Sequence, residues 1–582
     1  MNGVRHVCLI STNDYIEKRK IMCGILGGNN ARWNYQAALD VIMHRGPDGN
    51  KISKIKNFTM GFVRLAIVDL NESAMQPMIS VDGKYVITFN GEIYDYKQIR
   101  KNLEKLGYIF KTQSDTEVLL YAFIEWKEKV TDYIEGIFAF SIYDIENELV
   151  YLFRDRVGVK PLYYYVNGDD FAFSSELKAI EKLLNKSLDI DKTALYDYFN
   201  YLCIPEPKTI YKKVRRLEPG SFLIYSIKNN RIVKNERYWM PIANPYEGDV
   251  LSEDSLKEKI STLRTLINNS IRKQLVADVP VGSFFSGGID SSIVTVAAKS
   301  YKSDILSYGI AFTDERYDES KYIKRIGNHI GANYKIEYFE QEDFQKLKRM
   351  LISSFDEPFA DISFYPTFFV SKIARKDVTV VLTGDGGDEL FGGYTRYFKQ
   401  YESNRQSPVV VSNLIKTLNK KACDVLYDLI PEYLYGESLD YFKLRRRMGI
   451  PLDYDDAWCY RKYYEKDLPP ITRMRYMDFM TYLPNDILTK VDRMSMLNSL
   501  EARVPLLDKD IVEFAFSLSQ KECNPDNKSK GLFRLAYSQE IPDEMFERNK
   551  AGFMMPHRFM KSYGNITKKI CNDYSNKTKI VV

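Results

Sequence analysis

Two glycine-rich segments, each directly after a short apolar run, constrain the fold of this 582-residue chain more than any other feature. The first, SGGIDSS at 286–292, follows VPVGSFF and leads into a sequence of helical character. The second, TGDGGDE at 383–389, follows VTVVL. Apolar runs separated by helix-length segments are typical of βα units and a parallel sheet. Loops that follow two parallel strands converge on the usual ligand crevice of such a sheet.

The residue types in these loops indicate a phosphate site. Two glycines let the backbone approach a ligand, and the amides at the start of the following helix favour an anion. The GK[ST] ending of a Walker loop is missing. Carboxylates beside a polyphosphate are expected chiefly as Mg²⁺ ligands, and Asp290 and Asp388 are the candidates. The alternative is an ordinary strand-to-helix turn followed by a solvated acidic turn.

The first half of the chain has a different pattern. Alternating apolar and polar residues predict half-buried antiparallel strands at 60–69, 85–94, 136–144 and 149–154. Helical stretches at 95–106 and 116–130 predict helices packed on these sheets. Residues 206–250 are rich in Pro, Gly and charge and are interpreted as a junction. We therefore expect an α+β unit at 23–205 and an α/β unit at 251–582.

The second unit is expected to change character along its length. Its apolar strands are predicted at 279–285, 305–312 and 378–382, with helices between them. Beyond Tyr394 the sequence is helical and aromatic, so a helical C-terminal part is predicted.

Composition excludes several classes of protein. The 83 Lys and Arg residues against 78 Asp and Glu give a net charge of +5, which provides no electrostatic case for nucleic acid. Seven scattered cysteines and four histidines argue against a disulfide scaffold or a zinc cluster. No run reaches the roughly 18 to 20 apolar residues of a membrane-spanning helix. A cytoplasmic enzyme is expected.

Several motifs resemble the ATP pyrophosphatase family and, within it, the class B, glutamine-hydrolysing asparagine synthetases. The resemblance extends over nearly the whole chain from Met22. It is carried by SGGIDSS at 286–292, DEPFADIS at 356–363, LTGDGGDELFGGY at 382–394, LPNDILTKVDRMSM at 483–496 and SLEARVPLLD at 499–508.

The resemblance implies an ATP site. Ser286, Gly287, Gly288, Asp290 and Ser291 would bind the phosphates. Phe284 and Ile310 would lie against the adenine, with Thr383 and Gly384 touching the nucleotide. Lys490 would neutralise the departing pyrophosphate, Glu389 would belong to the catalytic centre, and Lys550 is a weaker candidate. Without the family resemblance, the sequence around Lys490 predicts a helix with a surface face that includes Lys490 and a buried stripe of Met residues. Asp385 stands where the family often has Glu, so its role is left open.

Met22-Cys23-Gly24-Ile25 resembles the start of a class II glutamine amidotransferase, an N-terminal nucleophile enzyme. Its cysteine becomes the first residue, because a free α-amino group with a pKa near 8 can accept the thiol proton. Here residues 1–22 precede Cys23. They are interpreted as an upstream stretch before a true start at Met22, as a cleaved leader, or as the sign of a silent glutaminase half.

The remaining parts of a glutamine pocket are also present. The resemblance assigns the glutamine α-carboxylate to Arg64 and its α-ammonium to Asp115, with Glu92 nearby. Asn90 and the amide of Gly91 would form the oxyanion hole. The same Asn-Gly pair is also a strong hairpin signal. Residues 45–49, RGPDG, form a turn on composition alone and a lid over glutamine by the resemblance.

The implied reaction is ATP-driven adenylation of aspartate to β-aspartyl-AMP, followed by amidation with ammonia from glutamine. The products are asparagine, AMP, pyrophosphate and glutamate. One alternative is a related amidotransferase acting on another carboxylate, such as an acidic sugar or cell-wall precursor. Another is a catalytically silent glutamine- or nucleotide-binding regulatory protein. ATP and Mg²⁺ are the expected cofactors, aspartate and glutamine the substrates, and a homodimer is suggested by the family only.

Overall fold

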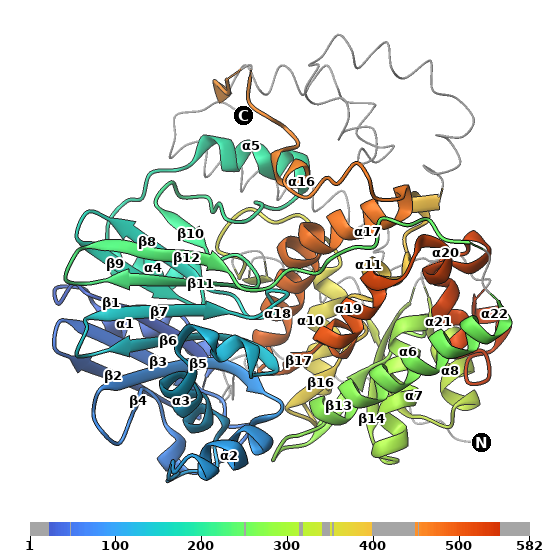
Figure 1. The fold of residues 1–582 in the computed structure, drawn as a ribbon, viewed down its shortest axis with the longest axis horizontal. Coiled ribbons are helices and arrows are strands. Elements are labelled where there is room, and N and C mark those ends of the chain that lie inside the picture. The colour runs from blue at the N-terminus through green and yellow to red at the C-terminus, as the bar shows by residue number, and fades with distance from the viewer. Residues whose placement is uncertain are drawn as a thin grey trace.

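A computed structural model of the chain describes residues 23–46, 48–249, 252–313, 318–339, 350–351, 354–398, 448–451 and 453–546. Within these residues the chain forms two antiparallel sheets in the first half and one parallel sheet in the second (Figure 1). The predicted fold, an α+β unit followed by an α/β unit, is confirmed. Residues 1–22 and Lys550 lie outside the described residues.

The first antiparallel sheet holds the strand that follows Cys23. Its order is β10-β8-β9-β1-β3-β2, so β1 is an inner strand. The strands are β1 (Gly24–Gly28), β2 (Gly49–Ile55), β3 (Phe58–Arg64), β8 (Tyr163–Asn167), β9 (Asp170–Ser174) and β10 (Val214–Arg216). Helices α1 (Tyr35–Asp40), α4 (Leu177–Leu184) and α5 (Lys192–Tyr201) contribute to the apolar core on one face of this sheet.

The second antiparallel sheet has the order β12-β11-β7-β6-β5-β4. Its strands are β4 (Met78–Ile79), β5 (Tyr85–Ile93), β6 (Gly136–Asp144), β7 (Leu149–Arg154), β11 (Ser221–Ser226) and β12 (Arg231–Arg237). Helices α2 (Tyr96–Lys105) and α3 (Asp115–Trp126) pack on its outer face. A separate apolar core lies between the two sheets. The first half is therefore layered as helices, sheet, sheet and helices.

Side-chain alternation explains this layering. In β6, Phe138, Phe140 and Ile142 belong to the core under α2 and α3, whereas Ala139 and Tyr143 belong to the core between the sheets. Successive side chains of a strand point to opposite faces, so a strand with apolar residues at both parities is covered on both sides. β6 is thus buried on both faces.

The parallel sheet of the second half has the order β15-β14-β13-β16-β17. Its strands are β13 (Val281–Phe284), β14 (Leu306–Phe312), β15 (Asn333–Phe339), β16 (Val380–Leu382) and β17 (Glu501–Arg503). From β13 the chain adds β14 and β15 on one side, and later β16 and β17 on the other. The strand order reverses between β13 and β16, so the loops after these strands lie at the switch point of the sheet.

Two strands of this sheet were not predicted. β15 was missed, and β17 falls in the region expected to be helical beyond Tyr394. β17 has three residues, too few for a period-two pattern, and its extended form is fixed by parallel pairing with β16.

Many helices surround the parallel sheet in the described part of the second half. They include α6 (Glu253–Gln274), α7 (Ile289–Tyr301), α10 (Phe364–Ala374), α11 (Gly387–Phe391), α18 (Leu488–Met496) and α19 (Lys509–Ser517). The others are α8 (Ser320–His329), α16 (Trp458–Arg461), α17 (Pro470–Met480), α20 (Gln520–Cys523), α21 (Gly531–Ala536) and α22 (Asp543–Phe546). Short helical turns occur at η2 (Met43–Arg45), η3 (Glu72–Ala74), η4 (Lys127–Asp132), η6 (Leu483–Ile487), η7 (Pro505–Leu507) and η8 (Pro525–Asn527). No described helix is long and apolar enough to cross a membrane.

The segment predicted as a junction, 206–250, is largely part of the first half. It contains β10, β11 and β12, which complete the two antiparallel sheets. Their side chains alternate too briefly to stand out among the Pro, Gly and charged residues. The link that follows Arg237 runs along the second half, where Trp239 donates to Glu513 at 2.9 Å and Asn244 to the carbonyl of Phe516 at 2.8 Å.

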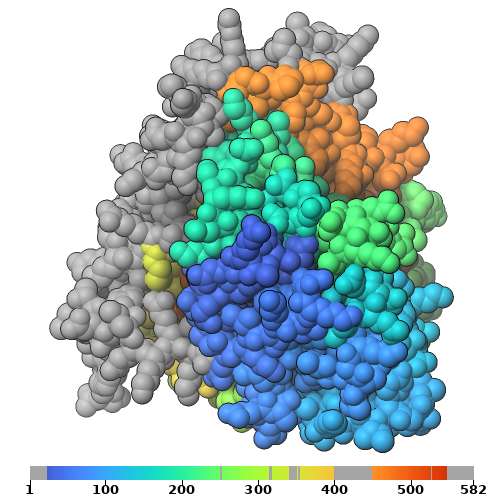
Figure 2. Space-filling view, turned by 90° about the vertical axis from the view of Figure 1, so that its left-hand side faces the viewer, coloured from blue at the N-terminus to red at the C-terminus, as the bar shows by residue number. Residues whose placement is uncertain are grey.

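The two halves pack into one body. One apolar core contains residues of both, including Phe153 of β7 and Leu507 of η7. Figure 2 shows the first half, in blue to teal, against the orange stretch near residue 460 and the green link. The boundary between the halves is therefore an internal packed surface.

We expect Phe153→Ala to lower the free energy of unfolding by about 3 to 5 kcal/mol. Phe153 is fully buried and stacks on Phe140 and Phe222, with ring centroids 4.7 and 5.3 Å away. Leu106→Ala is the matched control, because Leu106 is 58% exposed and its loss should change stability by less than about 0.5 kcal/mol. Chemical denaturation measures both, and equal effects would contradict the burial assigned to Phe153.

Candidate active sites

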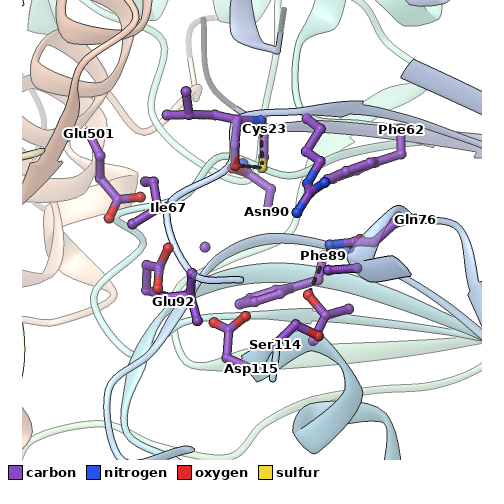
Figure 3. A pocket seen from close by; sticks show the side chains of 16 residues that line it. Cys23, Phe62, Ile67, Gln76, Phe89, Asn90, Glu92, Ser114, Asp115 and Glu501 are labelled. Atoms are coloured by element: carbon purple, nitrogen blue, oxygen red, sulfur yellow. Dashed lines mark hydrogen bonds between the residues drawn. The ribbon is translucent and has the colours of Figure 1, made fainter. Parts of the chain in front are cut away.

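Cys23 lies at the rim of a pocket in the first half, immediately before β1 (Figure 3). Its sulfur donates to the carbonyl of Leu65 at 3.4 Å and accepts from the amide of Leu65 at 3.3 Å. The pocket is lined by every residue predicted for glutamine binding: Cys23, Arg64, Asn90, Gly91, Glu92 and Asp115. These residues are separated in the sequence and are brought together by β1, β3, β5 and the start of α3.

Asn90 and Gly91 lie inside β5, opposite Ala139 and Phe138 of β6, and not at a hairpin turn. Gly91 has φ +152°, and a Cβ there would lie 2.0 Å from the carbonyl oxygen of Ile137. Only glycine fits this position. The amide of Asn90 is fully buried against the pocket and has no hydrogen-bond partner among the described residues. A buried amide in this state is satisfied by a ligand or by water.

The pocket is rich in carboxylates. Burial raises the pKa of Asp115 to about 7, although its carboxylate accepts from the amide of Ile93 at 3.1 Å. Burial and the charges of Asp115 and Glu501 raise the pKa of Glu92 well above its ordinary value. Burying like charges together favours a cationic ligand, which stabilises the ionised forms. The site is therefore suited to an ammonium group.

Arg64 contributes the positive charge of the pocket. It is the last residue of β3, and its guanidinium donates to the backbone carbonyls of Asp69 and Asn71. These contacts fix the planar group in place within the pocket lining. Its predicted pairing with a carboxylate of the ligand stays a prediction.

Glu501 also lines the Cys23 pocket, although it belongs to β17 of the second half. It pairs with Arg503 at 2.7 Å and with Lys160 of the first half at 3.3 Å. Glu501 lies within the SLEARVPLLD motif at 499–508, which predicts no role for it in this pocket. The approach of β17 to the first half is a tertiary feature that spacing in the sequence does not carry.

The thiol of Cys23 is poorly suited to ionise while residue 22 is attached to it. Burial, with the charges of Glu92 and Glu501, raises the pKa of Cys23 to about 12. Arg64 and the Leu65 amide act in the opposite direction but do not compensate. A nucleophilic thiolate here needs a base in direct contact with it.

The residues of the predicted lid take a different position from the one expected. Arg45 is fully buried and binds Glu176 and Asp492, and it does not line the pocket. Asp48 accepts from the amide of Ala66 at 3.0 Å. Pro47 lies outside the described residues. In this structure Arg45 is part of the contact between the halves.

The two glycine-rich loops of the second half pack against each other at the switch point. A Cβ on Gly384 would lie 2.7 Å from the amide nitrogen of Ser291, and one on Gly387 would lie 2.5 Å from Asp290 Oδ1. The hydroxyls of Ser286 and Ser291 lie 3.0 Å apart, and Gly287 has φ +71°. No side chain caps α7, which starts at Ile289. The start of α7 therefore keeps the character of an anion site.

Asp290 and Asp388, the predicted metal ligands, converge on one cation. Lys530 contacts both, with 2.7 Å between its Nζ and Asp388 Oδ1. Burial alone would lower the pKa of Lys530, but these two carboxylates raise it. The described residues hold no group of three or more metal-ligating side chains. Two carboxylates at a phosphate loop nevertheless fit Mg²⁺, which is usually held by one or two carboxylates and the substrate phosphates.

Lys490 lies on α18 and is buried, so the surface-helix interpretation is wrong. Its Nζ donates to Asp361 Oδ2 and to the hydroxyl of Ser363, both at 2.7 Å. Burial alone would raise the pKa of Asp361, but Lys490 holds it down at about 2. Burial and the neighbouring Asp361 raise the pKa of Asp486, which favours its protonated form. Lys490 thus faces a cluster of carboxyl groups.

Glu389 is another buried acidic residue close to this cluster. It lies in α11 and accepts a hydrogen bond from Tyr394 at 2.6 Å. Burial and the charge of Asp388 raise the pKa of Glu389 to about 7. Burial also raises the pKa of Asp385. A carboxyl group with a pKa near neutrality can exchange a proton at physiological pH.

The residues predicted to contact the base of the nucleotide lie at the same sheet. Phe284 ends β13 and Ile310 lies in β14, and both belong to one apolar cluster. Thr383 follows β16 and is buried, and its amide donates to the carbonyl of Arg503 at 2.8 Å. Their contacts with a nucleotide stay predictions.

Comparison with known proteins gives a family match for each half of the chain. A family model for asparagine synthase matches residues 262–581, and one for the glutamine amidotransferase domain matches residues 22–239. The chain is 33% identical to asparagine synthetase [glutamine-hydrolyzing] 1 of Bacillus subtilis, over 92% of this chain and 87% of that protein. The chain belongs to the asparagine synthase family. Its recognition as a glutamine-hydrolysing asparagine synthetase homologue from the sequence is thereby confirmed.

Two other relatives are similar to this chain over most of its length. A putative asparagine synthetase [glutamine-hydrolyzing] 2 of Methanocaldococcus jannaschii is 36% identical, over 78% of this chain and 93% of that protein. The amidase chyE of Penicillium rubens is 26% identical, over 90% of this chain and 84% of that protein.

Three residues of the second site were missed by sequence reasoning. Asp486 lies in η6, four residues before Lys490, so its proximity is local, whereas Asp361 approaches Lys490 only where α10 packs on α18. Lys530 lies in the stretch NKSKG, which has no distinguishing signal. Its approach to Asp290, 240 positions away, is a product of the fold.

The pKa of Cys23 predicts its reactivity in protein that retains residues 1–22. A thiol with a pKa of about 12 is almost fully protonated at neutral pH. Its alkylation by iodoacetamide should therefore rise about tenfold per pH unit between about pH 7 and 11, because the thiolate is the nucleophile. Peptide mass spectrometry measures the rate at Cys23 alone. A plateau below about pH 9 would contradict the burial argument.

Proposed function

We propose that this protein makes asparagine from aspartate, with ATP as the energy source and glutamine as the nitrogen donor. The observation that carries the proposal is the pairing of two sites within one packed chain. A pocket with Cys23, Asn90 and Gly91 has Glu501 of the second half in its wall, and β17 continues from Glu501 into the sheet of the phosphate loops. The comparisons support the same reaction.

Cys23 is proposed to attack the side-chain amide carbon of glutamine. Its α-amino group accepts the thiol proton once residues 1–22 are absent, and the proton passes to the departing ammonia. The amide of Asn90 and the N–H of Gly91 bind the oxyanion of the tetrahedral intermediate. The C–N bond breaks to leave a thioester, which water hydrolyses to glutamate. Asp115 and Glu92 bind the α-ammonium of glutamine, and Arg64 its α-carboxylate.

The second half is proposed to activate aspartate. The β-carboxylate attacks the α-phosphorus of ATP, the bond to the β-phosphate oxygen breaks, and pyrophosphate leaves. Ser286, Ser291 and the start of α7 hold the phosphates, and Lys490 balances the charge of the leaving group. Phe284 and Ile310 pack on the adenine, beside Thr383 and Gly384. Asp290 and Asp388 would hold Mg²⁺, which supplies further charge neutralisation when bound.

Ammonia then attacks the acyl carbon of β-aspartyl-AMP, and AMP leaves. Attack places a positive charge on nitrogen, so a base must take one proton. Glu389 is proposed for this role, because its raised pKa of about 7 lies near the pH at which proton transfer is efficient. Ammonia passes between the sites inside the protein, since water at the acyl-adenylate would hydrolyse it.

Further proposals follow from the same assignment. The amidotransferase unit begins at Cys23 and extends through β12 to Arg237, and the ATP-dependent unit covers 251–582. The compartment is the cytoplasm, and a homodimer is the proposed assembly. Amidation of a carboxylate other than that of aspartate is a second candidate function, because a relative at 26% identity carries a name other than asparagine synthetase.

Asn90→Ala tests the oxyanion hole. Loss of one oxyanion donor should lower the glutaminase kcat by about 10² to 10³, while ammonium-dependent AMP formation is kept. Thr88→Val is the control, because Thr88 lies two residues earlier on β5, is equally buried and does not line the pocket. Glutamate release and aspartate-dependent AMP release are measured on each variant. Unchanged glutaminase in Asn90→Ala would remove Asn90 from the mechanism.

Lys490→Met tests the adenylation site. We expect aspartate-dependent exchange of labelled pyrophosphate into ATP to fall by about 10² or more with either nitrogen donor, because a transition-state charge is lost. Glutaminase activity should persist. Lys490→Arg keeps the charge and should retain part of the activity. A full exchange rate in Lys490→Met would contradict the role given to this residue, and an exchange that needs another carboxylate would favour the second candidate.

A further inference from the structure

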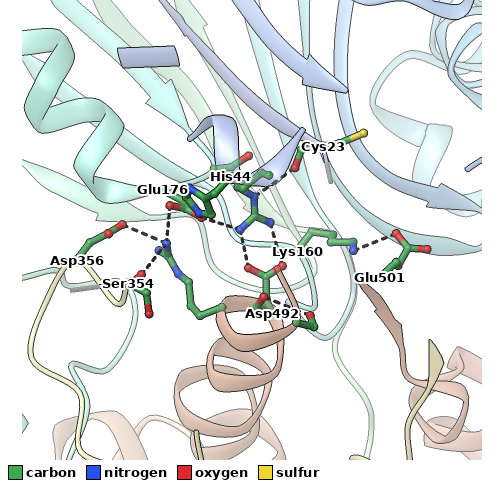
Figure 4. A network of polar contacts seen from close by, with 12 residues as sticks. Cys23, His44, Lys160, Glu176, Ser354, Asp356, Asp492 and Glu501 are labelled. Carbon is green, nitrogen blue, oxygen red and sulfur yellow. Dashed lines mark hydrogen bonds and ion pairs between the residues drawn. The ribbon is translucent and has the colours of Figure 1, made fainter. Parts of the chain in front are cut away.

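A network of buried charges connects the backbone of Cys23 to the helix of Lys490 (Figure 4). It is called the interface network here, and its members are the cations Arg45, Lys178 and Arg493 and the carboxylates Glu176, Asp356 and Asp492. Their side chains are at most 6% exposed, except Lys178 at 24%. The charges balance, three against three. His44 adds a contact to Glu176 at 2.9 Å, and burial lowers its pKa toward the neutral form.

One end of the network is the nucleophile residue itself. Arg45 Nε donates to the carbonyl oxygen of Cys23 at 3.2 Å. The same guanidinium makes a two-pronged contact with Asp492, from Nη1 at 2.9 Å and from Nη2 at 3.0 Å. Because a guanidinium is rigid and planar, a shift of the Cys23 backbone changes the geometry at Asp492.

The other end is the adenylation site. Asp492 and Arg493 follow Lys490 by two and three residues on α18, which is buried along nearly its whole length. Arg493 binds Asp356 at 3.1 Å, and Lys490 binds Asp361 at 2.7 Å. Both carboxylates belong to the segment 354–363, so α18 and this segment are joined at two points. A rotation of α18 would move Lys490 relative to the carboxyl cluster.

We propose that Arg45 and Asp492 are a positioning pair that couples the two sites, so that glutamine is hydrolysed mainly when ATP and aspartate are bound. The proposal rests on the proposed function. Burying ionised side chains is costly, and apolar residues would hold two halves together at least as well. Arg45 instead joins the Cys23 carbonyl to Asp492 on the Lys490 helix through one planar guanidinium, so the link depends on the direction of a displacement. Coupling carried by such contacts is reciprocal.

Asp492→Asn tests the pair in the full-length enzyme, because it removes one charge with almost no change in shape. Glutamate release is measured with and without ATP and aspartate, and AMP release with glutamine or ammonium. In the unaltered enzyme we expect ATP plus aspartate to stimulate glutamate release about fivefold or more. In Asp492→Asn we expect stimulation below about twofold and more than one glutamate per AMP, with ammonium-dependent AMP release kept.

Two further variants separate coupling from stability. Asp492→Glu keeps the carboxylate and should restore at least half of the stimulation. Glu135→Gln removes a different ion pair between the halves, Lys273–Glu135, which touches neither Cys23 nor α18, and should behave like the unaltered enzyme. If Asp492→Asn does not fold, Arg45→Lys replaces it, because lysine keeps the charge and loses the two-pronged contact.

Several outcomes would overturn the proposal. They are normal stimulation in Asp492→Asn, equal uncoupling in Glu135→Gln, or a parallel fall of both activities with an unchanged glutamate-to-AMP ratio. Glutamate release that ATP and aspartate do not stimulate in the unaltered enzyme would also overturn it, while leaving asparagine synthesis intact. Absence of aspartate-dependent AMP with ammonium would instead mean that the proposed function itself fails.

Discussion

Burial of ionised side chains between the two halves is the constraint on which the arrangement of both sites depends. Arg45, Arg493 and Arg503 are almost completely buried, and each is paired with carboxylates. A buried charge that loses its partner is strongly destabilising, so such pairs tolerate little displacement. They fix the distance and orientation of the halves more strictly than apolar contacts, which can slide.

This rigid contact has chemical consequences at each site. The pocket of Cys23 is completed by Glu501 from the second half, and the carboxylates it gathers give it affinity for an ammonium group. The same burial makes the thiol of Cys23 hard to ionise. In the proposed mechanism Cys23 therefore needs a base at its own α-amino position, which makes the residues before it matter to the chemistry.

Sequence reasoning recovered the parts of the fold that are local. The SGGIDSS and TGDGGDE loops follow β13 and β16 as predicted, and β5, β6 and β7 match their predicted runs closely. The six residues predicted for the glutamine site, Cys23, Arg64, Asn90, Gly91, Glu92 and Asp115, all line one pocket. What escaped prediction depends on distant contacts. β17 is a strand only because β16 lies beside it, β10 to β12 join sheets formed earlier in the chain, and Lys530 reaches Asp290 from an undistinguished stretch. Arg45, expected over the glutamine pocket, is drawn away by Glu176 and Asp492.

The transfer of glutamine nitrogen to aspartate within one protein is the central claim, and isotope transfer tests it most directly. The enzyme is given ATP, Mg²⁺, aspartate and glutamine labelled with ¹⁵N in its side-chain amide, together with excess unlabelled ammonium. Mass spectrometry of the product measures the label. The account predicts asparagine whose amide carries far more ¹⁵N than the ammonium in solution, because the nitrogen moves internally. Asparagine with the isotope content of the bulk ammonium, or a labelled product that is not asparagine, would contradict it.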